Sequence, residues 1–273
     1  MANYLGPDDG DSPDEHWSGS AVQAPSSDGR RTSRLRRWFS SAVAILLKAK
    51  LLLVILSMFA SMLLYGLAFG WPFGVGLVLL IAVHELGHVV AIRQRGMKAT
   101  LPIFIPFMGA LVGLQQQPQD AEEEAYIGIA GPVFGMAAAC FCWWLGYRMH
   151  SELLLLLASF GMIMHIFNLM PVVPLDGGRT VAFLRWKAWA PGLLAMLVLL
   201  FYDPVTHAIT FDPFAILILA FVLYNFRARL LNPPSPLYDQ IALSTKWLYG
   251  GVWFGLLGLA VYGYLRIPLH VGI

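Results

Sequence analysis

Charged residues are scarce in this chain: Asp, Glu, Lys and Arg make up 12% of its 273 residues, and hydrophobic residues make up 58%. Soluble globular domains carry about 25% charged residues, so this composition excludes an ordinary soluble domain. Cysteine is rare as well. Cys140 and Cys142 lie together in an apolar run, where we interpret them as small buried side chains rather than as metal or redox ligands.

Long apolar runs take the place of the missing charge. A bilayer core about 30 Å thick needs roughly 20 apolar residues per helix, and the chain supplies that length repeatedly. Continuous runs of this kind exclude the alternating pattern of a transmembrane β-barrel. We therefore predict an all-α polytopic membrane protein. About six to seven transmembrane helices are expected, from the candidate spans 51–69, 73–92, 125–145, 153–170, 188–202, 207–226 and 247–265.

The first part of the chain has a different character. Residues 1–37 are rich in Asp, Ser, Gly and Pro, acidic at first and basic at the end. This composition is typical of a disordered tail, and its basic end is expected to hold the N-terminus in the cytoplasm and to touch anionic lipid headgroups. We divide the rest into a first transmembrane region at 38–72, a core at 73–185 and C-terminal transmembrane helices at 186–273. We expect a multi-pass protein of the plasma (inner) membrane of a prokaryote.

The motif HELGH lies at residues 84–88, inside the second apolar run. On a helix, His84 and His88 lie about one turn apart on the same face, where both can bind one zinc ion, and Glu85 beside them can activate a water molecule. Ionisable residues inside a membrane helix are costly unless they pair with or coordinate something. We therefore prefer a catalytic zinc site to a purely structural role.

Basic residues indicate the orientation of this helix. With a cytoplasmic N-terminus the second span returns to the cytoplasm, in agreement with Arg93, Arg95 and Lys98 at its end. Counted back from Arg93 at about 1.5 Å per residue, His88 lies about 8 Å and His84 about 14 Å inside the membrane. We predict that the site lies in the cytoplasmic half of the bilayer.

The apolar part of residues 99–125 does not suit a spanning helix, because it contains two prolines and two glycines. We predict a short membrane-embedded strand or re-entrant hairpin, FIPFMGALVGL, at the cytoplasmic face. Non-helical backbone at this depth is tolerated only against protein or a water-filled cavity, so the segment is expected to line the route to the site. The acidic run that follows, Asp120 and Glu122 to Glu124, is interpreted as solvated.

A catalytic zinc ion needs a third protein ligand, which HELGH does not contain. Asp203 and Asp212 fall on the far side of the membrane in this topology. Asp176 lies at the matching depth, in the segment NLMPVVPLDGG at 168–178, where two prolines break the fourth helix. We predict that Asp176 is the third ligand. The alternative is a turn or helix-end residue that faces water, which the LDGG sequence also suits.

Two more polar residues lie near the end of the fourth span. Asn168 could donate a hydrogen bond to the oxyanion that forms on a peptide carbonyl, or it could hydrogen-bond another helix, and the residues alone leave both open. His165 lies one turn earlier on the same face. For His165 we favour a supporting or packing role over zinc ligation.

Together these motifs resemble the intramembrane zinc metalloproteases of the site-2 protease family, peptidase family M50. The matching elements are HELGH, the segment GIAGPVFG at 128–135 and NLMPVVPLDGG at 168–178, which has the family's N-x-x-P-x-x-x-L-D-G pattern. GIAGPVFG by itself suggests tight helix packing, because small residues let helix backbones approach closely. The resemblance covers residues 73–185.

The resemblance implies a three-helix catalytic core whose zinc ligands are His84, His88 and Asp176. Glu85 would then be the catalytic base. Asn168 would help to position or stabilise the scissile carbonyl.

The resemblance also implies that the segment around Gly109 and Ala110 offers a strand edge to an unwound substrate. The expected activity is that of a zinc endopeptidase that cleaves transmembrane segments of membrane proteins near the cytoplasmic face, in regulated intramembrane proteolysis. We expect transmembrane protein substrates and membrane lipid as partners, and no nucleic acid. The alternative function is a catalytically silent, zinc-holding membrane scaffold that binds single-span partners.

Overall fold

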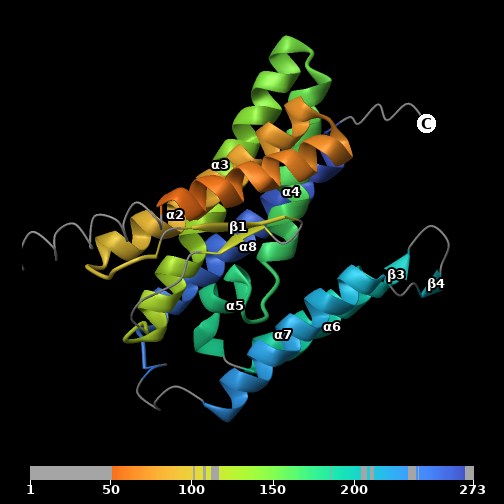
Figure 1. The fold of residues 1–273 in the computed structure, drawn as a ribbon. Coiled ribbons are helices and arrows are strands. Elements are labelled where there is room, and N and C mark those ends of the chain that lie inside the picture. Colours follow the sequence, from red (N-terminus) through yellow and green to blue (C-terminus); the bar gives the residue numbers. More distant parts are fainter. Residues whose placement is uncertain are drawn as a thin grey trace, which may run out of the picture. The chain divides into compact units, whose positions relative to one another are not determined.

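The computed structural model describes residues 51–100, 102–106, 109–111, 117–184, 186–203, 208–209, 212–232, 238 and 240–267. Over these residues the protein consists of α-helices and two short hairpins (Figure 1), so the prediction of an all-α polytopic protein is confirmed. The predicted disordered tail at 1–37, with its basic end, lies outside the described residues.

Four of the described helices are long and apolar enough to cross a membrane: Leu51–Phe69, α2 (Trp71–Gln94), α3 (Ala121–Met149) and α8 (Leu243–Arg266). Two further apolar helices are shorter, α4 (Glu152–Asn168) and α6 (Trp186–Phe201). The total of six to seven spans stays a prediction.

Helices α2 and α3 form the interior of the bundle. Within their apolar windows, 56% of α2 and 50% of α3 is buried inside the protein, against 17% for Leu51–Phe69 and 22% for α8. Helix α3 packs along both α2 and α4, and α8 packs across α3 and α4. The HELGH helix is therefore covered by protein on the face that carries its histidines.

Short connections join the first helices. Gly70, with a φ of 92°, takes a conformation that favours glycine, and Pro72 in the first turn of α2 suits a helix start. Helix α3 ends at Met149 and is followed by His150, whose left-handed φ is 52°. Ser151 then caps α4 by accepting from the Leu154 N–H at 3.4 Å. This two-residue link makes α3 and α4 antiparallel neighbours.

The start of α3 corrects one prediction from the sequence. The Asp120 side chain caps the helix by accepting from the Glu123 N–H at 2.8 Å, and the Glu123 carboxylate accepts from the Gln119 N–H at 2.7 Å. Glu123 and Glu124 are both buried. The interpretation of this acidic run as solvated is therefore wrong for these two residues, because helix capping and pairing compensate their burial.

Glu124 is the residue that is paired. Its carboxylate lies 2.6 Å from the Arg229 guanidinium, near the end of α7 (Pro213–Leu231), and also accepts a hydrogen bond from the Tyr238 hydroxyl. The Ala121 N–H donates to the Tyr238 carbonyl at 3.0 Å. These contacts tie the end of α7 to the first turn of α3.

The predicted strand or hairpin is confirmed. Strands β1 (Ile103–Ile105) and β2 (Gly109–Leu111) pair antiparallel, with Phe104 opposite Ala110. Phe104 is buried, and its N–H donates to the hydroxyl of Ser57 at 3.2 Å. The hairpin is thus attached to the helix that precedes α2.

Helix α4 ends at Asn168 and is followed by an irregular segment that contains Pro171 and Pro174. Proline ends the helix because it lacks a backbone N–H. The chain then forms two short turns of helix, α5 (Asp176–Thr180) and η1 (Ala182–Leu184). A Cβ on Gly177 would lie 2.1 Å from the Leu169 carbonyl oxygen, so the fold of this segment requires glycine there.

Helices α6 and α7 pack against each other and are joined by a small hairpin of β3 (Tyr202–Asp203) and β4 (Ala208–Ile209) (Figure 1). The predicted span at 207–226 is shifted in the structure. Its helix begins at Pro213 and continues to Leu231, because proline is favoured in a first turn and disfavoured inside a helix.

Candidate metal centre

Three side chains from two distant segments meet in the interior of the described structure. Nε2 of His84 lies 2.9 Å from Oδ2 of Asp176, and Nε2 of His88 lies 3.3 Å from Oδ1 of the same carboxylate. The two Nε2 atoms are 3.2 Å apart. The structure therefore brings together the three residues that the sequence predicts as ligands.

This geometry fits zinc. Four ligand atoms at about 2.0–2.1 Å from a tetrahedral zinc ion lie about 3.3 Å from one another, close to the distances found here. Two imidazoles and a carboxylate are a zinc donor set that leaves a fourth position open. The side chains of His84, His88 and Asp176 are only 3%, 7% and 12% exposed. Helix α2 and the segment after α4 thus place three buried side chains where they could hold a zinc ion.

Each histidine has a neighbour at its other ring nitrogen. Nδ1 of His88 donates to the backbone carbonyl of Ile127 in α3 at 2.8 Å, which leaves Nε2 with a free lone pair. Nδ1 of His84 lies 3.3 Å from Nε2 of His165, a fully buried residue of α4. Such partners orient metal-binding imidazoles.

The small residues of GIAGPVFG make room for these rings. A Cβ on Gly131 would lie 2.1 Å from Nε2 of His88, and a Cβ on Gly135 would lie 2.4 Å from Nε2 of His165. On the facing helix, a Cβ on Gly87 would lie 2.4 Å from the Ala130 carbonyl oxygen. The tight helix packing predicted for this segment is confirmed, and it leaves space for the imidazoles.

Glu85 lies beside the ligands on α2. It is 6% exposed, and its carboxyl group interacts electrostatically with His88, Asp176 and Arg179. A buried carboxyl group next to a metal position can exchange a proton with a water molecule there.

Asn168 is not part of the ligand group. It is the last residue of α4 and is half-buried, and its amide makes no hydrogen bond with any of the described residues. Its predicted action on the scissile carbonyl stays a prediction.

Arg179 is a residue that the sequence analysis did not assign to the site. It comes three positions after Asp176, in α5, and its guanidinium interacts electrostatically with Glu85 and His88. Its Nη2 atom is buried and has no partner among the described residues. The sequence feature that could have indicated this residue is its position directly after LDGG.

A polar cavity of about 660 Å³ adjoins this segment. Its lining includes Val173, Pro174 and Arg179, which flank Asp176 in sequence, and Glu124 and Arg229. The cavity therefore lies between the segment that carries Asp176 and the polar contacts at the end of α7, and none of the three ligand residues is part of its lining.

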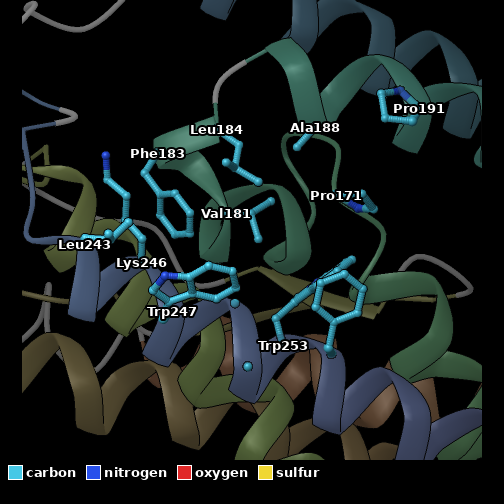
Figure 2. Close-up of a pocket in the computed structure, with 13 residues that line it drawn as sticks. Pro171, Val181, Phe183, Leu184, Ala188, Pro191, Leu243, Lys246, Trp247 and Trp253 are labelled. Atoms are coloured by element: carbon cyan, nitrogen blue, oxygen red, sulfur yellow. The ribbon is translucent and has the colours of Figure 1, made fainter.

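A second cavity, of about 620 Å³, has an apolar lining. In Figure 2, Trp247 and Trp253 of α8 face Val181 and Phe183 of the segment after Asp176. Lys246 is the charged residue in the lining, and none of the three ligand residues contributes to it. This cavity suits an apolar occupant and is not the metal centre.

Comparison with known families gives one matching family model, described as peptidase family M50, over residues 72–151. This part contains HELGH and GIAGPVFG and ends before the segment at 168–178. The assignment of Asp176 as the third ligand therefore depends on its distances to His84 and His88.

Among curated relatives, zinc metalloprotease MJ0392 of Methanocaldococcus jannaschii is 28% identical over 40% of this chain and 33% of its own length. Rip3 of Mycobacterium tuberculosis, itself only provisionally named a zinc metalloprotease, is 32% identical over 43% of this chain and 33% of its own length. Stage IV sporulation protein FB of Bacillus subtilis is 26% identical over 41% of this chain and 39% of its own length. The chain thus spans between a third and two fifths of these relatives. The family match and these relatives together confirm the resemblance of the chain to the site-2 protease family of zinc metalloproteases, peptidase family M50.

Proposed function

We propose that this chain is a zinc-dependent endopeptidase that cuts transmembrane segments of membrane proteins inside the bilayer, near the cytoplasmic face. The observation that carries the proposal is that Asp176 meets His84 and His88, which lie with Glu85 on a helix apolar enough to cross a membrane. Ionisable groups at such a depth are functional candidates. The family match and the names of the relatives support a protease over other zinc proteins.

In this proposal the two imidazoles and the Asp176 carboxylate hold the ion. Zinc, when bound, supplies Lewis acidity that polarises a peptide carbonyl and makes a water molecule acidic near neutral pH. Glu85 takes a proton from the attacking water as its oxygen bonds to the carbonyl carbon. Glu85 then gives that proton to the amide nitrogen as the C–N bond breaks.

Water must reach a site that lies inside a membrane. The polar cavity beside Pro174 and Arg179 supports a route from the cytoplasmic side. The orientation rests on basic residues: Arg93 and Arg95 end α2, and Arg227 and Arg229 lie near the end of α7. We propose on this basis that the N-terminus is cytoplasmic, and that the protein resides in the plasma membrane of a prokaryote.

A helical substrate must unwind before cleavage, because its carbonyls are hydrogen-bonded within the helix. The hairpin supports a way to hold the unwound chain. The Phe104 N–H points away from β2, towards Ser57, so Phe104 and Ala110 are a pair without mutual hydrogen bonds. The Ala110 N–H and carbonyl therefore also point outward, from the opposite edge of the hairpin. We propose that this edge pairs with the substrate.

The test uses Glu85→Gln as a substrate trap. Membrane proteins that crosslink to the variant are identified by mass spectrometry, and each is then co-expressed with the wild-type chain, with Glu85→Gln and with Glu122→Gln. Glu122 is 40% exposed and pairs with Arg95, so Glu122→Gln is a matched control. We expect cleavage by the wild type and the control, and zinc retention without cleavage by Glu85→Gln. Cleavage by Glu85→Gln would remove Glu85 as the base. A wild-type chain that captures partners and zinc but never cuts them would support the scaffold alternative.

A further inference from the structure

His165 is a buried histidine that the proposed chemistry does not use. It is 0% exposed and lies on α4, between the backbone of its own helix and the HELGH helix. Nδ1 of His165 lies 2.6 Å from the Gly161 carbonyl oxygen, and Nε2 lies 3.3 Å from Nδ1 of His84. Both ring nitrogens of His165 therefore have a hydrogen-bond partner, Nδ1 on its own helix and Nε2 on the HELGH helix.

These two contacts determine which nitrogen carries the proton. A carbonyl oxygen can only accept, so Nδ1 of His165 must be the donor to Gly161. In a neutral imidazole with a proton on Nδ1, Nε2 is an acceptor. Nε2 of His165 therefore accepts from Nδ1 of His84, and Nε2 of His84 is left with a lone pair.

That lone pair points to the ligand group. Nε2 of His84 is the atom 2.9 Å from the Asp176 carboxylate and 3.2 Å from Nε2 of His88. A doubly protonated His165 would reverse the hydrogen bond and put a proton on Nε2 of His84. The doubly protonated His165 would also be a cation in an apolar helix. Such a charge is costly, because no carboxylate among the described residues is hydrogen-bonded to His165.

The packing around His165 is built for this contact. Gly135 of α3 leaves the space, since a Cβ there would lie 2.4 Å from Nε2 of His165 and 3.1 Å from Cβ of His84. The other ligand has a simpler arrangement, because Nδ1 of His88 donates directly to the Ile127 carbonyl. The carbonyl of Gly161 acts on His84 in the same way, with His165 as the intermediary.

We propose that His165 is a positioning residue: it transmits the acceptor character of the Gly161 carbonyl to His84, and so holds His84 in the tautomer and orientation that bind zinc. This inference rests on the proposed zinc site and deepens it. Loss of a partner behind a metal-binding histidine typically weakens metal affinity about 10–100-fold.

Two amide substitutions test the inference. His165→Gln places an amide oxygen near the position of Nε2, within reach of His84. His165→Asn places its amide near the position of Nδ1, where it can reach Gly161 but not His84. Ser159→Ala removes a buried hydroxyl of α4 that has no hydrogen-bond partner among the described residues, and serves as the control. The zinc dissociation constant of each purified full-length variant is measured by competition with a chromogenic chelator, and the visible spectrum of each cobalt-substituted form reports ligand geometry.

We expect His165→Gln and Ser159→Ala to bind zinc within a few-fold of the wild type, and His165→Asn to bind about 10–100-fold more weakly with an altered cobalt spectrum. Equal zinc affinity of His165→Gln and His165→Asn, at any value, would overturn the positioning role and leave His165 as a packing residue. A wild-type chain that binds no zinc would instead overturn the metal site of the proposed function. No cleavage assay is involved, so the two failures are distinguishable.

Discussion

Asp176 and His84 are 92 positions apart in the chain, yet Oδ2 of Asp176 lies 2.9 Å from Nε2 of His84. His84 lies in the middle of the long helix α2, and Asp176 is the first residue of the short helix α5. The carboxylate also lies 3.3 Å from His88. Spacings of this size are those of ligands that share one zinc ion.

Replacement of Asp176 by Asn should nearly abolish zinc binding. The amide has almost the same shape as the carboxylate but lacks its charge, so the ion loses an anionic ligand. We expect the zinc dissociation constant, measured by chelator competition, to rise by more than about 100-fold. Loss of a residue that only hydrogen-bonds a metal ligand raises it by about 10–100-fold. Asp203→Asn, in the β3 strand, is the control. Zinc binding by Asp176→Asn at the wild-type affinity would remove Asp176 from the ligand set.

Replacement of Gly131 by Ala should displace His88. The new Cβ would lie 2.1 Å from Nε2 of His88, closer than van der Waals contact allows, so the ring must turn away from the ligand group. We expect weaker zinc binding and loss of cleavage while the helix content measured by circular dichroism is retained. Gly255→Ala, where nothing lies within 4 Å of the added Cβ, should keep both properties. Equal zinc affinity of the two variants would contradict this account of the small-residue segment.

Replacement of Ala110 by Pro tests the strand edge. Proline removes the N–H that points outward from β2 and so weakens pairing with an added strand. We expect cleavage of a trapped substrate to fall strongly while zinc content is unchanged, because no metal ligand lies on β2. Ala110→Ser keeps the N–H and should cleave like the wild type. If Ala110→Pro cleaves as well as Ala110→Ser, the substrate does not pair with this edge.

The contact of Tyr238 with Glu124 predicts a dependence of stability on alkaline pH. Burial, and then the negative charge of Glu124, raise the pKa of Tyr238 above its ordinary value of about 10. A phenol with a higher pKa in the folded than in the unfolded chain contributes stability below pH about 10, and this contribution is lost as the pH rises towards the folded value. The thermal midpoint of the wild type should therefore exceed that of Tyr238→Phe at pH 8, and the difference should shrink above pH 10. A difference that stays constant with pH would contradict this.

The sequence was sufficient for most of the chemistry of the site. Helical spacing alone puts His84 and His88 on one face, and the prolines after Asn168 mark the break that brings Asp176 to the same depth. Motifs of this kind are legible because they use local backbone geometry. The structure brings these three residues together as expected, and their catalytic roles remain proposals.

Contacts between distant segments could not be predicted in the same way. Glu124 and Arg229 are 105 positions apart, and nothing local in either sequence identifies the other. A run of acidic residues therefore suggested exposure to solvent, although one member is paired inside the protein. The hydrogen bond from His84 to His165 could not be predicted either. Helical periodicity predicts that His165 and Asn168 share a face of α4. The partner of His165 and its tautomer depend on how α2, α3 and α4 pack.

The most direct test of the zinc site is the zinc K-edge X-ray absorption spectrum of the purified wild-type chain, with zinc content determined on the same sample. We predict one zinc ion per chain, with two imidazole nitrogens and carboxylate oxygen at about 2.0–2.2 Å in a four-coordinate shell. A chain purified without zinc, or a spectrum with sulfur ligands or without imidazole scattering, would contradict the site formed by His84, His88 and Asp176.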